Sequence, residues 1–92
     1  MDVGPDTKLK LPDGVVVRDF GGEMVALNLS AGTYHGLNET AARALALLRE
    51  GNDVGETSAT IAAEYEAPPD EVQRDIEQLC RDLADRGLVE PA

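Results

Sequence analysis

Three short segments suited to β-strands occupy residues 15–37, and only tight turns separate them. VVVRDF (15–20) is rich in β-branched residues, EMVALNL (23–29) alternates along its length, and TYHGL (33–37) follows almost at once. Gly21-Gly22 suits a two-residue hairpin turn, and Ser30-Ala31-Gly32 suits a three-residue loop. Because connections this short join antiparallel neighbours, the sequence predicts a three-stranded antiparallel meander with residues 33–37 at its edge.

Two helices are predicted next. Asn38 is a good N-cap, and Gly51-Asn52 ends the first helix near Glu50. The apolar residues of this helix recur at helical spacing: Ala41, Ala44, Leu45 and Leu48. A weaker helix is expected over about residues 56–66, with three side chains facing inward: Ile61, Ala62 and Tyr65.

The third helix has the clearest pattern in the chain. Pro69 suits its first position, and Gly87 suits a left-handed end from which Leu88 packs back on Leu83. One apolar stripe runs along it: Val72, Ile76, Leu79, Cys80 and Leu83. Three strands followed by three helices predict an α+β domain of the winged helix-turn-helix kind.

The 92 residues suffice for one domain. We expect residues 1–7, with Gly, Pro and Asp, to form a flexible tail, and residues 8–92 to form the single domain, with a short edge strand near residues 8–11. No apolar run approaches the roughly 20 residues of a membrane span, and the first residues lack the apolar stretch of a signal peptide. A cytoplasmic location with no membrane partner is expected.

Little in the sequence indicates catalysis. His35 is the only histidine, and it reads as a solvent-facing strand residue without a nucleophile beside it. Cys80, the only cysteine, lies on the apolar stripe and reads as a small buried hydrophobe. The carboxylates have the spacing of solvated helix faces, so we predict no catalytic residues, no metal site and no cofactor.

The net charge of −10 is concentrated in the second half of the chain, where residues 50–92 hold 12 of the 18 acidic residues. Such a surface repels phosphates, so nucleic acid is not expected as a partner. The third helix itself carries acids at 70, 71, 75, 77, 82 and 85 against arginines at 74, 81 and 86, which disfavours the alternative of a DNA-binding winged helix.

The predicted edge strand indicates a binding function. Thr33 and Gly36 offer little obstruction to an incoming chain, so an extended peptide can add to residues 33–37 as a fourth strand. The amphipathic third helix would form the second wall of that groove. Covering of the edge by this helix, or its exposure to water, remains equally open from the pattern alone.

Two stretches carry a family resemblance: VVVRDFGGEMVALNLSAGTYHGLNETAARALALL (15–48) and IAAEYEAPPDEVQRDIEQLCRDLADRGLVE (61–90). A hairpin, a Gly-x-Tyr-x-x-Leu-Asn strand end, an apolar helix and a final helix ending in Leu-x-x-x-Gly-Leu resemble the PqqD-like recognition elements for precursors of ribosomally made, modified peptides. The resemblance implies a non-catalytic domain that binds a leader peptide antiparallel to the third strand, against the third helix. The implied peptide-binding residues are Thr33, Tyr34, His35, Gly36 and Leu37 on the strand, and Val72, Asp75, Ile76, Leu79 and Leu83 on the helix.

Within that family, the chain is most similar to the stand-alone B-type proteins of lasso peptide biosynthesis. This similarity implies a leader with a Tyr-x-x-Pro motif, a separate cysteine-protease leader peptidase as partner, and a cyclase acting afterwards. The alternatives are a PqqD-type chaperone that presents its peptide to a radical SAM enzyme, and an accessory subunit that stabilises an enzyme without touching its substrate.

Overall fold

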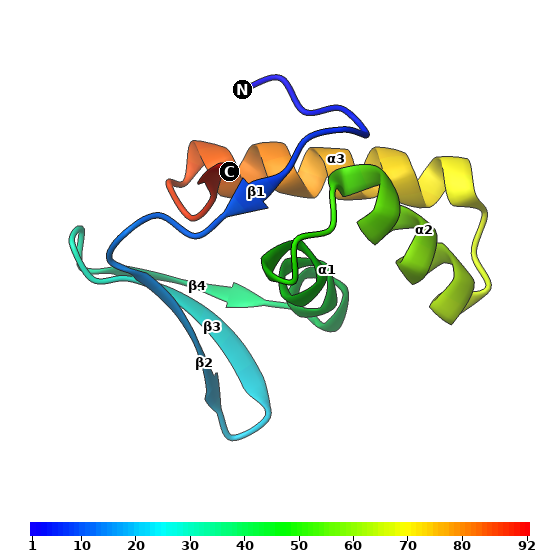
Figure 1. The fold of residues 1–92 in the computed structure, drawn as a ribbon. Helices are drawn as coiled ribbons and strands as arrows, with labels where there is room; N and C mark the ends of the chain where they lie inside the picture. Colours follow the sequence, from blue (N-terminus) through cyan, green and yellow to red (C-terminus); the bar gives the residue numbers. More distant parts are fainter.

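The computed structural model describes all residues 1–92 (Figure 1). The strands β2 (Val15–Phe20), β3 (Glu23–Asn28) and β4 (Thr33–Leu37) form an antiparallel sheet in the order β2-β3-β4. The helices α1 (Glu39–Arg49), α2 (Val54–Tyr65) and α3 (Pro69–Asp85) follow. The predicted meander and the three helices are therefore confirmed, and β4 is an edge strand as expected.

The two hairpin turns fix the register of the sheet. Gly21 and Gly22 both have positive φ angles, which lets the two-residue turn join Phe20 to its partner Glu23. The second connection is one residue longer than predicted, because β3 ends at Asn28 and its side chain accepts hydrogen bonds from the N–H groups of Ser30 and Ala31. Thr33 then pairs with Asn28, and the strand runs back along β3.

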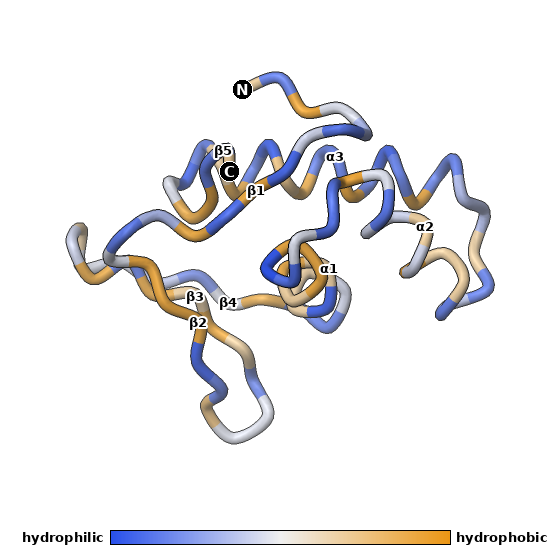
Figure 2. The backbone as a smooth tube through the Cα atoms, viewed as in Figure 1, coloured by the Kyte–Doolittle hydropathy of each residue, from blue (hydrophilic) through white to orange (hydrophobic).

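The helices are packed around one core. Residues from β1 (Leu9–Lys10), the sheet, all three helices and the last residues contribute to it, and Figure 2 shows the hydrophobic residues of α3 on its side toward α1 and α2. Asn38 caps α1, with its side chain accepting a hydrogen bond from the Ala41 N–H at 2.8 Å. Gly87 has a φ of 73°, and the N–H of Leu88 then bonds to the carbonyl of Leu83, as the predicted helix end requires.

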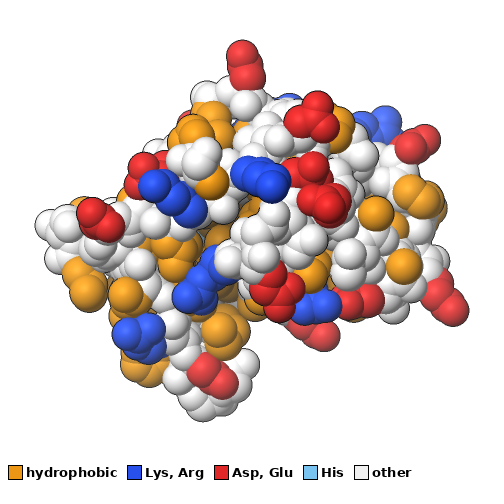
Figure 3. All heavy atoms as spheres, in the orientation of Figure 1, with side chains coloured by type: hydrophobic (Ala, Val, Ile, Leu, Met, Phe, Trp, Pro, Cys, Tyr) orange, Lys and Arg blue, Asp and Glu red, His pale blue; other side chains and the backbone are white.

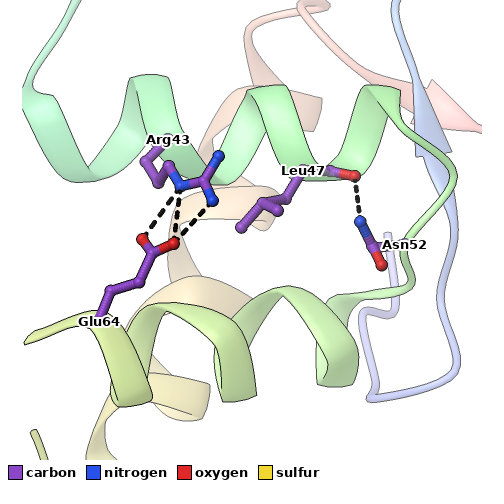
Figure 4. A network of polar contacts seen from close by, with 4 residues as sticks. All are labelled: Arg43, Leu47, Asn52 and Glu64. Carbon is purple, nitrogen blue, oxygen red and sulfur yellow. Dashed lines mark hydrogen bonds and ion pairs between the residues drawn. The ribbon is translucent and has the colours of Figure 1, made fainter. Parts of the chain in front are cut away.

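A bidentate ion pair joins α1 to α2. Arg43 donates to both carboxylate oxygens of Glu64, with Nη2 2.7 Å from Oε2 (Figure 4). The hydrogen bond from Arg43 lowers the pKa of Glu64. Nearby, the Asn52 side chain donates to the Leu47 carbonyl at 2.9 Å, which satisfies a carbonyl at the end of α1 (Figure 4). These contacts hold the α1–α2 pair against which α3 packs.

Two expectations about α2 also need correction. The helix α2 begins at Val54 instead of Glu56, because Asp53 and Glu56 form a capping box. Tyr65 does not face inward and is 45% exposed, because it is the last residue of α2, beyond the turns that contact the core.

The first seven residues also differ from the expected flexible tail. Val3 is buried in the core, and the carbonyls of Pro5 and Thr7 accept hydrogen bonds from Gly55 and Val54 at the start of α2. These bonds satisfy N–H groups that a helix leaves free at its first turn, so the segment acts as a cap for α2. Behind it, β1 pairs with β5 (Glu90–Pro91) to form a second, two-stranded sheet. No helix is long and apolar enough to span a bilayer.

Candidate peptide-binding cleft

The free edge of β4 presents the peptide groups of Tyr34 and Gly36. The Leu29 N–H donates to the Gly14 carbonyl, which places the odd-numbered residues of β3 in hydrogen bonds to β2. Hydrogen-bonded pairs alternate along an antiparallel ladder, so the even-numbered residues of β3 bond to β4 through their partners Thr33, His35 and Leu37. The N–H and C=O groups of Tyr34 and Gly36 therefore point away from the sheet.

The side chains of β4 alternate between two environments. Leu37 is buried and His35 is half-buried, on the face that packs toward the helices. Tyr34 is 78% exposed on the opposite face, next to Gly36, which is also exposed. A Cβ added at Gly36 would meet no atom within 4 Å. The edge is therefore accessible, and it carries no side chain at Gly36.

Contacts at the two sides of α3 show which of its faces lies toward β4. Nη1 of Arg86, the residue after the helix, is 3.4 Å from Nδ1 of His35. Arg81, on the other side of α3, places Nη2 3.4 Å from the Val3 carbonyl. The side that includes Arg86 also carries residues spaced three or four apart along the helix: Val72, Asp75, Leu79 and Asp82.

The orientation of α3 about its own axis separates the helix residues predicted for the site into an accessible group and a buried group. Val72 and Leu79 are half-buried and Asp75 is exposed, so all three are accessible on the side toward β4. Ile76 and Leu83 are 1% and 2% exposed, and lie in the core together with Cys80. The structure thus places Val72, Asp75 and Leu79 on the accessible side of α3 that also carries Arg86, the residue in contact with His35 of the edge strand, and places Ile76 and Leu83 in the core.

The start of α3 borders a surface hollow of about 290 Å³. Six residues line it: Ala67, Pro68, Glu71, Val72, Arg74 and Asp75. Val72 and Asp75 also belong to the side of α3 that carries Arg86. The hollow therefore lies at the end of this side that is next to the α2–α3 turn. Sequence reasoning missed Arg86 and the hollow. Arg86 lies at the helical spacing of Asp75, Leu79 and Asp82, a signal that becomes readable once the phase of α3 is known.

No group of three or more His, Cys, Asp and Glu side chains is placed to hold a metal ion. Burial raises the pKa of the Cys80 thiol to about 11, and the charge of Glu77 adds to this effect. Cys80 is fully buried in the core face of α3, so its surroundings favour the uncharged thiol.

The family model described as "Coenzyme PQQ synthesis protein D (PqqD)" matches residues 23–89, which include the sheet edge and all three helices. The chain belongs to the PqqD family. The resemblance noted from the sequence is thereby confirmed. A comparison with curated proteins gives no match.

Two solved structures are similar to this PqqD-family chain. One is described as "TbiB1 in Complex with the TbiA(beta) Leader Peptide". It is 38% identical, with a TM-score of 0.81 over 88% of this chain and 94% of that one. The other is described as "Lasso peptide synthetase B1 complexed with the leader peptide". It is 28% identical, with a TM-score of 0.86 over 91% and 99% of the two chains.

The buried thiol gives a direct test of how α3 packs. We expect Cys80 to resist alkylation by iodoacetamide at pH 8.5 in the folded protein and to react readily in urea, as mass spectrometry would show. The pKa of about 11 lies above the ordinary 9.0, so the protonated thiol contributes stability that is full below pH 9 and is lost as the pH rises through 11. Rapid alkylation of the folded chain would contradict the assigned phase of α3.

Proposed function

We propose that this domain binds the leader segment of a ribosomally made precursor peptide in lasso peptide biosynthesis, by strand addition to β4. The observation that carries the proposal is the free edge at Tyr34 and Gly36. The Arg86–His35 contact turns toward this edge the side of α3 that carries Val72, Asp75 and Leu79. Support comes from the two similar chains, which are described as complexes with leader peptides. The domain itself is non-catalytic in this proposal.

The bound leader would run antiparallel to β4. Its backbone would form hydrogen bonds with the N–H and C=O groups of Tyr34 and Gly36. These bonds would supply affinity that does not depend on the leader's side chains. Alternate leader side chains would point to the two faces of the extended sheet. Those on the helix face would contact Val72, Leu79 and Asp75, and an apolar leader residue there would be removed from water.

The predicted site residues have two roles in this arrangement. Contact with the leader falls to the exposed and half-buried members: Thr33, Tyr34, His35, Gly36, Val72, Asp75 and Leu79. Leu37, Ile76 and Leu83 are buried, so they would support the cleft from behind and fix its width. Substituting one of these three would reduce binding through loss of folding stability.

Strand addition makes a clear prediction at Gly36. Gly36→Pro removes the N–H that the leader would bond to, so we expect the leader affinity to fall by more than about tenfold. The matched control is Gly36→Ala, which keeps the N–H and adds a Cβ with open space around it. Fluorescence anisotropy with a labelled leader carrying Tyr-x-x-Pro measures both variants, and circular dichroism checks their folding. Equal affinity of a folded Gly36→Pro variant would contradict strand addition.

Delivery of the leader to a separate peptidase needs a docking face, and we propose the outer face of the sheet. Strand alternation places Val16, Phe20, Val25, Leu27 and Tyr34 there together with the charged Arg18 and Glu23, and Leu29 follows directly after β3. Three of them are exposed large side chains, at 58% for Phe20, 66% for Leu29 and 78% for Tyr34. Figure 3 shows hydrophobic side chains over the strands, whereas acidic side chains gather over the helices. An apolar patch of this kind is typical of a protein interface.

The net charge of the chain favours another protein, and not a second copy of this chain, as the partner that binds this face. Two copies with a net charge of −10 each would repel one another, which opposes self-association. A leader strand added to β4 would extend the same face, so a docked peptidase would contact the domain and the leader together. Delivery of this kind would take place in the cytoplasm, where the precursor is made. The cyclase would act on the cleaved product.

Measuring leader affinity and precursor cleavage in the same variants tests the docking face. We expect Phe20→Ser to leave leader affinity within about twofold, because Phe20 lies at the hairpin tip, away from the edge of β4. Cleavage of the precursor by the partner peptidase should slow by about fivefold or more, as for loss of an interface aromatic residue. Tyr65→Ser, which removes an exposed aromatic residue from α2, is the matched control and should change neither quantity. Unchanged cleavage with Phe20→Ser would exclude this face.

A further inference from the structure

Arg86 brings a positive charge without an acidic partner to the edge strand. The ion pairs of the structure are Arg43–Glu64 and Arg81–Glu77, so no carboxylate lies within 4.0 Å of the Arg86 guanidinium. Six of the eight basic residues, Arg86 among them, form no ion pair, and Arg86 forms none although Asp82 and Asp85 lie in the preceding turn. The guanidinium is instead 3.4 Å from Nδ1 of His35.

The His35 contact positions Arg86 but does not neutralise it. A guanidinium only donates hydrogen bonds, so Nδ1 of His35 is the acceptor in this contact. An imidazole nitrogen offers one acceptor site and no negative charge, whereas a carboxylate accepts two parallel hydrogen bonds from a guanidinium and neutralises its charge. Arg86 is therefore held next to β4 without a carboxylate partner.

We propose that Arg86 binds a carboxylate side chain of the leader peptide that occupies the cleft. The inference rests on the proposed leader binding and names one specificity-determining residue within it. An aspartate or glutamate on the helix-facing side of the leader would accept two hydrogen bonds from the guanidinium. His35 would hold the arginine in place while the cleft is empty and line the same subsite when it is filled.

The charges along α3 also give the leader a direction. Asp75 lies 11 positions before Arg86, or about 16 Å along a helix, and Glu71 lies beyond it at the surface hollow. In Figure 1, β4 and α3 run in opposite directions. A leader antiparallel to β4 would therefore meet Asp75 with its N-terminal part and Arg86 with its C-terminal part. The cleft fits a leader with a basic residue about five positions before an acidic one, since extended chain spans about 3.3 Å per residue.

A peptide series tests the carboxylate subsite. The probes are labelled synthetic leaders with Tyr-x-x-Pro and otherwise neutral residues, in which one Glu or one Gln is placed at successive positions after the Pro. We expect Glu to tighten binding over Gln by about three- to tenfold at one position, as for a single partly exposed ion pair. The advantage should shrink in high salt.

Variants of the protein test whether Arg86 causes the tighter binding of the Glu leader over the Gln leader. Arg86→Gln should abolish the preference for Glu, and Arg86→Lys should restore part of it. Arg81→Gln removes the same charge from the other side of α3 and should leave the preference intact. Binding of the neutral leader without any preference for Glu, or a preference that persists in Arg86→Gln, would overturn the inference and leave leader binding standing. Absence of binding by every leader would overturn both.

Discussion

The feature on which the rest of the structure depends is a three-stranded sheet whose edge strand, β4, has a neighbouring strand on one side only. Asn38 caps α1 directly after β4, so the chain turns into a helix where a fourth strand would otherwise begin. The register leaves Tyr34 and Gly36 with peptide groups that have no partner in the sheet. An unpaired edge commonly carries charge or proline that prevents association, and this one carries a glycine in an open position. The proposed binding site, the proposed docking face and the proposed role of α3 all follow from that edge.

In the proposed complex, the helix α3 would make the edge selective among peptides. Its core face, with Ile76, Cys80 and Leu83, anchors the helix to the domain and is unavailable to a ligand. Val72, Asp75 and Leu79 remain accessible on the adjoining side, and the Arg86–His35 contact places that side toward β4. Backbone pairing alone would accept many extended peptides. In the proposed complex, the side chains of α3 would supply the apolar and charged contacts that restrict the choice to a leader of matching pattern.

The order of the strands and helices could be predicted from local patterns because most of these patterns matched their tertiary setting. The paired glycines, Asn38, the Pro69 start and Gly87 fixed the turns and helix ends. Long-range contacts were not visible in the same way. The pairing of Leu9–Lys10 with Glu90–Pro91 and the cap that residues 5–7 form on α2 join segments far apart in sequence. Periodicity gave α3 an apolar stripe but could not separate its core residues from its cleft residues, and so Arg86 was missed.

Amide hydrogen exchange followed by NMR tests the central claim most directly. In the free protein, the N–H groups of His35 and Leu37 should exchange slowly because they bond to β3, whereas those of Tyr34 and Gly36 should exchange fast. Addition of a leader peptide with Tyr-x-x-Pro should slow exchange at Tyr34 and Gly36 and change His35 and Leu37 little. Leader binding that protects other amides and leaves Tyr34 and Gly36 fast would contradict strand addition to β4.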